Sequence, residues 1–405
     1  MSSTARSPSL RRTSLHCRGI RFPEGIPDTS HGVTNGLTSP TVLAAPRVPE
    51  HIDELLGQCL EMGASDLHLA AGAPPTARVN GDLVPMDNYA VLRSDVIEGL
   101  VFSILSERKI ADFKSELELD TSYSIPGKSR FRMNVFRQRG SIGAVLRTIP
   151  FHIPDFASLN MPAIIQTFAQ LPRGLVLVTG PTGSGKSTTL AALLDIINRT
   201  KPVHILSCED PIEFLYGHKK AIVNQREVGE DTKSFASALK RALREDPDVI
   251  MVGEMRDLET ISMALTAAET GHLVFATLHT QSAPQTVDRM VDVFPPDQQG
   301  QIRVMLATSL QAVVTQQLLP ACDGGGRVAA VEILIATPAV RNLIRERKGY
   351  QLASQMQSGA RFGMVTMDQS LAELVLTRRI SIDVGLEHAS NPDDLRSLLG
   401  IRSAM

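Results

Sequence analysis

Apolar residues first recur with a helical period near residue 50. Five of them fall at i, i+3, i+4, i+7 and i+8: Ile52, Leu55, Leu56, Cys59 and Leu60. This spacing predicts an amphipathic helix packed on a core. Apolar and polar residues then alternate over 66–69 and 77–80, and the second run ends at an Asn-Gly pair typical of a hairpin. We therefore expect residues 48–150 to form a small α+β domain.

Beyond residue 160 the apolar residues come in short uninterrupted runs. Four such runs alternate with helical stretches: 175–178, 203–206, 249–252 and 273–275. A strand that is buried on both faces has this continuous pattern, so we predict an α/β domain over 161–405 with a mostly parallel sheet. Two Ile-Pro pairs near residue 150 interrupt the pattern, and we place the linker between the domains at 151–160.

Composition narrows the classes of function. Residues 1–47 are rich in Ser, Thr, Pro, Gly and Arg and show no periodicity, which predicts a disordered tail. The remaining chain has ample apolar material for folded domains, since 43% of the 405 residues are hydrophobic. No apolar run approaches the roughly 20 residues of a membrane helix. A net charge of −2, four tyrosines and no tryptophan argue against a nucleic-acid-binding protein.

A phosphate-binding motif follows the first of the short apolar runs. The residues that match G-x-x-x-x-G-K-[ST], with the first residue of the helix that follows, are Gly180, Pro181, Thr182, Gly183, Ser184, Gly185, Lys186, Ser187 and Thr188. The glycines let backbone N–H groups turn toward phosphate oxygens, and the helix N-terminus adds positive charge there. We expect Lys186 to reach the β- and γ-phosphates of ATP and the Ser187 hydroxyl to bind Mg²⁺. A chance glycine-rich turn would not stand between a strand and a helix.

Acidic residues follow two other predicted strands. Glu209, Asp210 and Glu213 come after the run 203–206, at the strand end where parallel sheets bind ligands. We expect Glu213 to orient the attacking water, with Glu209 and Asp210 holding water on the metal. Glu254 follows the run 249–252, where Gly253 takes the position usual for a metal-binding Asp. The simpler alternatives are an acidic loop that faces solvent at 209–213 and a buried strand that ends at a solvated Glu254.

Two histidines flank the last of the four runs. His279 falls just past the predicted strand, within reach of a γ-phosphate, and His272 precedes it. We expect both to sense the γ-phosphate, although a lone histidine is more often structural.

These motifs together resemble the secretion-ATPase superfamily of hexameric motors: the phosphate loop, an Asp box at 209–213, a Gly-Glu acidic strand and a His box at 272–279. The segments 223–228 and 238–248 are also similar to that superfamily. Within it, the segment 339–346 resembles the C-terminal helix of the type IV pilus retraction ATPases, the twitching-motility group. Val340, Leu343 and Ile344 would form the buried side of that helix, with Arg341 and Arg345 on another face.

The resemblance implies a RecA-like ATPase domain preceded by a PAS-like domain, a homo-hexamer, and ATP with Mg²⁺ as cofactors. It also implies that Arg132, Arg147 and Arg289 act on the nucleotide of a neighbouring site. The protein would work in the cytoplasm, at the inner face of the cell membrane, against an inner-membrane pilus platform protein and without nucleic acid.

Three alternatives remain at this point. A pilus-assembly or type II/IV secretion ATPase would share the motifs, but many of these carry a four-cysteine zinc module, and the four cysteines here form no C-x-x-C pair. A RecA-like nucleic-acid motor fits the charge poorly. A non-enzymatic regulator would not need a phosphate loop with its acidic partners.

Overall fold

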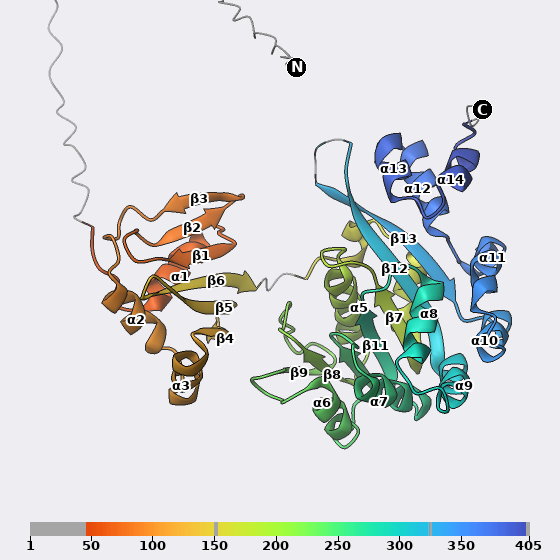
Figure 1. The fold of residues 1–405 in the computed structure, drawn as a ribbon, viewed down its shortest axis with the longest axis horizontal. Coiled ribbons are helices and arrows are strands. Elements are labelled where there is room, and N and C mark those ends of the chain that lie inside the picture. The colour runs from red at the N-terminus through yellow and green to blue at the C-terminus, as the bar shows by residue number, and fades with distance from the viewer. Residues whose placement is uncertain (1–45, 150–152, 323, 325, 402–405) are drawn as a thin grey trace, which may run out of the picture. The chain divides into compact units, whose positions relative to one another are not determined.

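The computed structural model describes residues 46–149, 153–322, 324 and 326–401 (Figure 1). The tail predicted at 1–47 lies outside these residues except for Pro46 and Arg47. Two β-sheets with their helices follow one another along the described chain, one before residue 150 (the N-terminal domain) and one after residue 152 (the C-terminal domain), and each is described by itself.

The N-terminal domain is an antiparallel sheet with helices, as the alternating pattern predicted. Its six strands lie in the order β3-β2-β1-β6-β5-β4: β1 (Asp66–Leu69), β2 (Thr76–Val79), β3 (Asp82–Pro85), β4 (Glu118–Ile125), β5 (Ser129–Gln138) and β6 (Ser141–Ile149). The helices are α1 (Ile52–Glu61), α2 (Ser94–Phe102) and α3 (Glu107–Glu116). The predicted hairpin joins β2 to β3, where Asn80 and Gly81 both have positive φ, as a type I′ turn requires. On the predicted apolar face of α1, Leu60 is partly buried and the other four residues are fully buried against this sheet.

The C-terminal domain is built on one seven-stranded sheet. The strand order is β13-β12-β7-β11-β10-β8-β9, and only β13 is antiparallel to its neighbour. The strands are β7 (Gly174–Thr179), β8 (His204–Glu209), β9 (Ile222–Glu227), β10 (Val249–Val252), β11 (Leu273–Leu278), β12 (Leu310–Pro320) and β13 (Arg327–Ile335). All four predicted runs are strands of this sheet, so the predicted α/β class with a mostly parallel sheet is confirmed.

Helices cover both faces of this sheet. They are α4 (Ala163–Thr167), α5 (Lys186–Thr200), α6 (Phe235–Ala242), α7 (Leu258–Glu269), α8 (Ala283–Asp292), α9 (Gln299–Ser309), α10 (Pro338–Arg345), α11 (Leu352–Gln357), α12 (Met367–Leu376), α13 (Ile382–His388) and α14 (Pro392–Leu398). One core lies under α7 to α11, and a second lies under α4 and α5. Phe156, inside the predicted linker, is buried in the second core, so packing of this domain begins before residue 160.

A third, smaller core joins α12 to α14 with the ends of β12 and β13. None of the helices in the described ranges combines the length and the apolar character needed to cross a membrane.

The helix that resembles the retraction helix is α10, and one of its two arginines is not solvated. Arg341 donates from Nη1 to the carbonyls of Ala307 and Thr308, at 2.6 and 2.7 Å, and from Nη2 to Gln311 Oε1 at 3.2 Å. The two carbonyls belong to the last turn of α9, which leads directly into β12. Arg341 therefore caps α9, because a cation at a helix C-terminus satisfies carbonyls that have no partner within the helix.

Arg341→Ala should lower the free energy of unfolding by about 1–3 kcal/mol, because two or three hydrogen bonds from a charged donor are lost. Arg345→Ala is the matched control, since Arg345 is exposed on the same helix and has no ion pair among the described residues. Its thermal unfolding midpoint should equal that of the wild type. Equal midpoints for both variants would show that the cap contributes no stability.

Candidate active site

The predicted phosphate loop connects β7 to α5. Gly180, Gly183 and Gly185 all have positive φ, which side chains other than glycine rarely adopt. At Gly180 a Cβ would also lie 2.3 Å from the carbonyl oxygen of Gln316, so no side chain fits there. Such a glycine-rich turn leading into a helix N-terminus is typical of loops whose backbone N–H groups bind phosphate.

Strand β12 supports the loop from the side through Gln316, which is buried. Its Nε2 donates to the carbonyl of Ser184 at 2.6 Å, and its Oε1 accepts from the Thr189 hydroxyl at 3.0 Å. The buried hydroxyls of Thr179 and Thr315 pair at 2.8 Å just below the loop. Gln316 was not predicted from the sequence. The available signal was the polar run 315–317 between apolar residues of one strand, since a buried amide needs partners.

Lys186 is the first residue of α5, and its side chain is buried. Nζ donates to the carbonyls of Gly180 and Pro181, both at 3.0 Å. Burial lowers the pKa of Lys186, while the charges of Glu254 and Glu213 oppose that effect. The ammonium group is therefore held inside the loop and faces carboxylates across the cavity.

The Asp box is ordered by Glu209, which is buried at the end of β8. Its carboxylate accepts from the Ser207 hydroxyl at 2.6 Å, from Gln225 Nε2 at 3.1 Å and from the Glu213 backbone N–H at 3.5 Å. Burial raises the pKa of Glu209 to about 7, against the effect of these donors. Because its oxygens are already engaged, Glu209 fixes the position of Glu213, whereas the side chains of Asp210 and Glu213 are exposed.

Two residues of β9 hold the same loop from the edge of the sheet. Gln225 also accepts from the Tyr216 N–H at 2.9 Å, and Glu227 accepts from the Ile212 N–H at 3.0 Å. These positions lie in a segment that the sequence analysis matched to the superfamily without giving them a role. Four consecutive polar residues on this edge strand, 224–227, were the available signal.

Glu254 and His279 meet opposite the phosphate loop. Glu254 follows β10, His279 follows β11, and His279 Nε2 lies 3.0 Å from Glu254 Oε1. Arg256 also donates to this carboxylate, at 2.7 Å from Nη2 to Oε2. Burial alone would raise the pKa of Glu254, but the bond from Arg256 and the charge of His279 outweigh it, and the pKa is lower than usual. Glu254 is therefore ionised and orients the His279 ring.

Close packing crowds any side chain at position 253. A Cβ there would lie 3.2 Å from both the Cys208 carbonyl oxygen and the Glu209 Cα, which are backbone atoms of the neighbouring strand β8. Glycine avoids this crowding at the position usual for a metal-binding Asp.

His272 does not lie near Glu254 and the phosphate loop. It precedes β11, so a six-residue strand of about 20 Å separates it from His279. Its Nδ1 lies 2.9 Å from the Ala267 carbonyl oxygen, at the end of α7. Of the two histidines, His279 lines the cavity at the phosphate loop and His272 does not.

Two of the three predicted arginines lie on strands of the N-terminal sheet, and the third lies on helix α8. Arg132 on β5 is directly opposite Arg147 on β6, and Arg147 Nε donates to the buried Asp66 at 2.8 Å. The charge of Arg147 is therefore paired with Asp66, beside Arg132 on the neighbouring strand. Arg289 is exposed on α8 and, within the described ranges, has no hydrogen bond or ion pair.

The motif residues that line one cavity of about 590 Å³ are Thr182, Gly183, Gly185, Lys186, Ser187, Thr188, Glu209, Asp210, Glu213, Gly253, Glu254 and His279. A second cavity of about 340 Å³ adjoins it at Gly185 and Thr188 and is lined in part by Leu159, Met161 and Leu318. In the part of the chain that the structure describes, no three acidic, His or Cys side chains are grouped closely enough to bind a metal by themselves.

Comparisons with known proteins agree with this arrangement. The family model described as "Type II/IV secretion system protein" matches residues 45–379. The "Type IV pilus retractation ATPase PilT" of Pseudomonas aeruginosa is 54% identical over 343 residues, which are 85% of this chain and 99% of the relative. A "Twitching motility protein" of Neisseria gonorrhoeae is 52% identical over 321 residues, 79% of this chain and 86% of the relative.

Among solved structures, that of "the Pilus Retraction Motor PilT and Bound ADP" superposes with a TM-score of 0.80 at 49% identity, covering 86% of this chain and all of that one. With the complete phosphate loop and its acidic partners in one cavity, these matches establish that the chain belongs to the type II/IV secretion ATPase family and is an ATP-hydrolysing pilus retraction ATPase of the PilT group.

Proposed function

We propose that this chain hydrolyses MgATP in the cavity in front of α5 and works as a ring of six subunits that withdraws pilin into the membrane. The observation that carries the proposal is the meeting of Lys186 and the loop amides with Glu213, Glu254 and His279 on one cavity. In this proposal the ring acts at the inner face of the cell membrane, against an inner-membrane platform protein.

The triphosphate would lie along the loop, with its base in the adjoining cavity. The loop amides and the N-terminus of α5 would hold the α- and β-phosphates, and Lys186 would exchange its carbonyl partners for β- and γ-phosphate oxygens. Leu159, Met161 and Leu318 provide apolar surface for a flat base at the other side of Gly185.

The residues present fit a magnesium ion bound mainly through phosphate. Mg²⁺ in such sites takes few protein ligands and keeps several waters, in agreement with the lack of a self-sufficient acidic group in the described residues. Ser187 would hold it, and the exposed Asp210 would bind its waters. When bound, the ion would neutralise charge that develops on the phosphates. Because Glu209 is engaged elsewhere, we assign it the positioning of Glu213.

Glu213 would orient the attacking water, since its side chain is exposed on the cavity while its backbone N–H is held by the Glu209 carboxylate. His279, oriented by Glu254, would contact the γ-phosphate and change position when that phosphate leaves. Arg132, Arg147 and Arg289 would add positive charge from a neighbouring subunit, which makes hydrolysis depend on how subunits are arranged.

Glu213→Gln should bind ATP with nearly unchanged affinity and lose hydrolysis by at least about 100-fold, because the amide cannot take a proton from water. Lys186→Ala should lose both binding and turnover. Steady-state phosphate release and binding of a fluorescent ATP analogue measure the two effects. Wild-type kcat in Glu213→Gln would show that another residue is the base.

Arginine action between subunits can be tested by mixing two inactive variants. Arg289→Ala keeps an intact phosphate loop, and Lys186→Ala keeps an intact Arg289. In rings assembled at random from equal amounts of the two, about a quarter of the sites combine an intact loop with an intact arginine of the neighbour. Such rings should therefore recover about a quarter of wild-type activity. Mixing Lys186→Ala with Glu213→Gln is the control, because both changes fall in the same subunit's site and no recovery is expected. Equal results for both mixtures would contradict action between subunits.

Glu209 should make the stability of the protein fall as pH rises. Its pKa is raised to about 7 in the fold, so the folded protein holds this proton more tightly than the unfolded chain, in which the carboxyl titrates near pH 4.3. The resulting stability is complete below about pH 4.3 and is lost as pH rises toward 7. Relative to the wild type, Glu209→Gln should therefore gain up to about 3 kcal/mol between pH 4.5 and 8.

Thermal unfolding of both proteins across this range measures the difference. Asp210→Asn is the matched control, because Asp210 is exposed and its replacement should give a curve parallel to the wild type. A parallel curve for Glu209→Gln would mean that the carboxyl titrates normally.

A further inference from the structure

A buried carboxylate outside the nucleotide cavity joins two helices of the C-terminal domain. Glu332 lies on β13 and is 7% exposed. Its Oε1 accepts from the Ala283 N–H at 2.6 Å and its Oε2 accepts from the Met367 N–H at 3.4 Å. Ala283 and Met367 are the first residues of α8 and α12, so one side chain is shared by the N-termini of two helices.

This arrangement accounts for a charge in the interior. An isolated buried carboxylate is costly, but two helix N-termini supply N–H donors and the positive ends of their dipoles. Burial raises the pKa of Glu332, and the two backbone amides oppose that effect. The two backbone N–H groups thus fix the position of the Glu332 side chain. Removing one carboxylate oxygen would leave the first N–H of α8 or of α12 without an acceptor.

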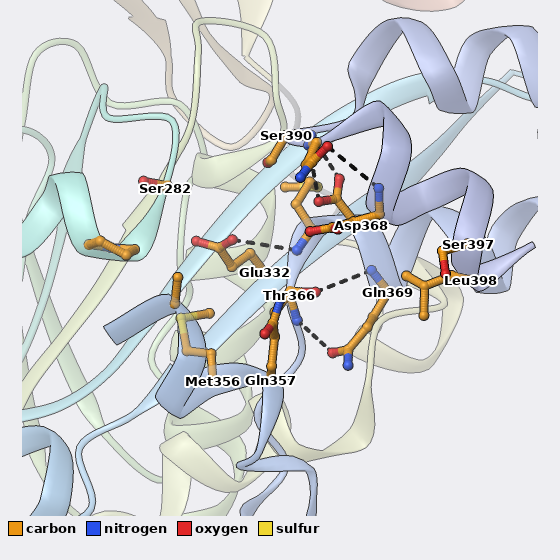
Figure 2. Close-up of a pocket in the computed structure, with 15 residues that line it drawn as sticks. Ser282, Glu332, Met356, Gln357, Thr366, Asp368, Gln369, Ser390, Ser397 and Leu398 are labelled. Carbon is orange, nitrogen blue, oxygen red and sulfur yellow. Dashed lines mark hydrogen bonds between the residues drawn. The ribbon is translucent and has the colours of Figure 1, made fainter. Parts of the chain in front are cut away.

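A second carboxylate continues the connection toward the C-terminus. Asp368, the second residue of α12, accepts from the Ser390 N–H at 2.7 Å and from the Asn391 N–H at 3.1 Å, and Asn391 caps α14. Figure 2 shows Glu332 and Asp368 on the same pocket, of about 520 Å³, with Ser390 beside Asp368. The starts of α8, α12 and α14 are therefore connected through two acidic side chains.

The other end of the connection is the nucleotide site. In the sheet, one row of paired residues runs across four strands: Leu278, Thr179, Thr315 and Glu332. Leu278 immediately precedes His279, and Ala283 follows His279 by four residues. The segment that carries His279 is thus anchored at its start by β11 and at its end by Glu332.

We propose that Glu332 is a positioning residue for ATP hydrolysis, which fixes the segment 279–283 and makes the placement of His279 depend on helices α12 to α14. This inference rests on the proposed contact of His279 with the γ-phosphate. A shift of α12 would move the Glu332 carboxylate, which is the acceptor for the first N–H of α8. In the other direction, a movement of His279 after the γ-phosphate leaves would reach α12 and α14 through Glu332.

Glu332→Gln in the full-length protein tests the proposal. Glutamine keeps the shape and one acceptor, but its NH₂ group would face a backbone donor, so one of the two helix starts loses its bond. We expect kcat to fall about tenfold while the Kd of a fluorescent ATP analogue stays within about twofold. Ser370→Ala is the control, because it removes a different bond between α12 and β13, from the Val331 N–H at 3.0 Å. It should lower the unfolding midpoint and leave kcat unchanged.

His279→Ala separates the two hypotheses. If this variant keeps wild-type kcat, the proposed role of His279 fails. If it loses activity, Glu332→Gln should add little further loss in the double variant, because both changes act on the same contact. Wild-type kcat in Glu332→Gln, an equal loss in Ser370→Ala, or a full additional loss in the double variant would overturn the proposal for Glu332.

A second test of the connection uses the wild-type protein without any substitution. Hydrogen exchange of the wild-type protein, with and without a non-hydrolysable MgATP analogue, should show altered protection at 366–370 as well as at 279–286. Residues 366–370 do not line the nucleotide cavity. Protection that changes only at 279–286 would contradict the connection.

Discussion

The contact between strand β12 and the phosphate loop is the constraint on which the nucleotide site depends. The loop needs three glycines in left-handed backbone conformations, and such a segment has little intrinsic preference for one shape. Gln316 fixes it by bonding the Ser184 carbonyl, and the Gln316 carbonyl comes so close to Gly180 that only glycine fits. The loop amides are therefore set in place before any phosphate arrives, which is the condition for electrostatic stabilisation without reorganisation.

The rest of the site follows from the order of the parallel strands. β7, β11, β10 and β8 are neighbours, so the segments that follow them end at one edge of the sheet. Four segments that are far apart in the sequence thus supply the phosphate loop, His279, Glu254 and the Asp box. On the other side of the loop, β12 and β13 continue the sheet, and this places Glu332 in register with the residue before Gly180. The same sheet that assembles the site also connects it to the C-terminal helices.

Much of this architecture could be predicted because strands buried on both faces and the phosphate loop leave strong local patterns. Lys186 was predicted from the phosphate-loop motif, and Glu213 and His279 from their places just after predicted strands; the structure puts all three on one cavity. Gln316 and Glu332 were not predicted, and Arg341 was predicted only as part of a helix face, because their partners are backbone groups more than 30 residues away, which leave no trace in side-chain patterns. His272 was expected to act with His279 because both belong to the same His box, but they flank a strand, and an extended strand puts its two ends farthest apart.

The most direct test of the central claim is an experimental structure with a non-hydrolysable MgATP analogue. The account predicts that Lys186 Nζ leaves the carbonyls of Gly180 and Pro181 for phosphate oxygens, while the Gln316 bond to Ser184 stays unchanged and His279 faces the γ-phosphate. An analogue bound elsewhere, with Lys186 still on the two carbonyls, or a loop that rearranges away from Gln316 on binding, would contradict it.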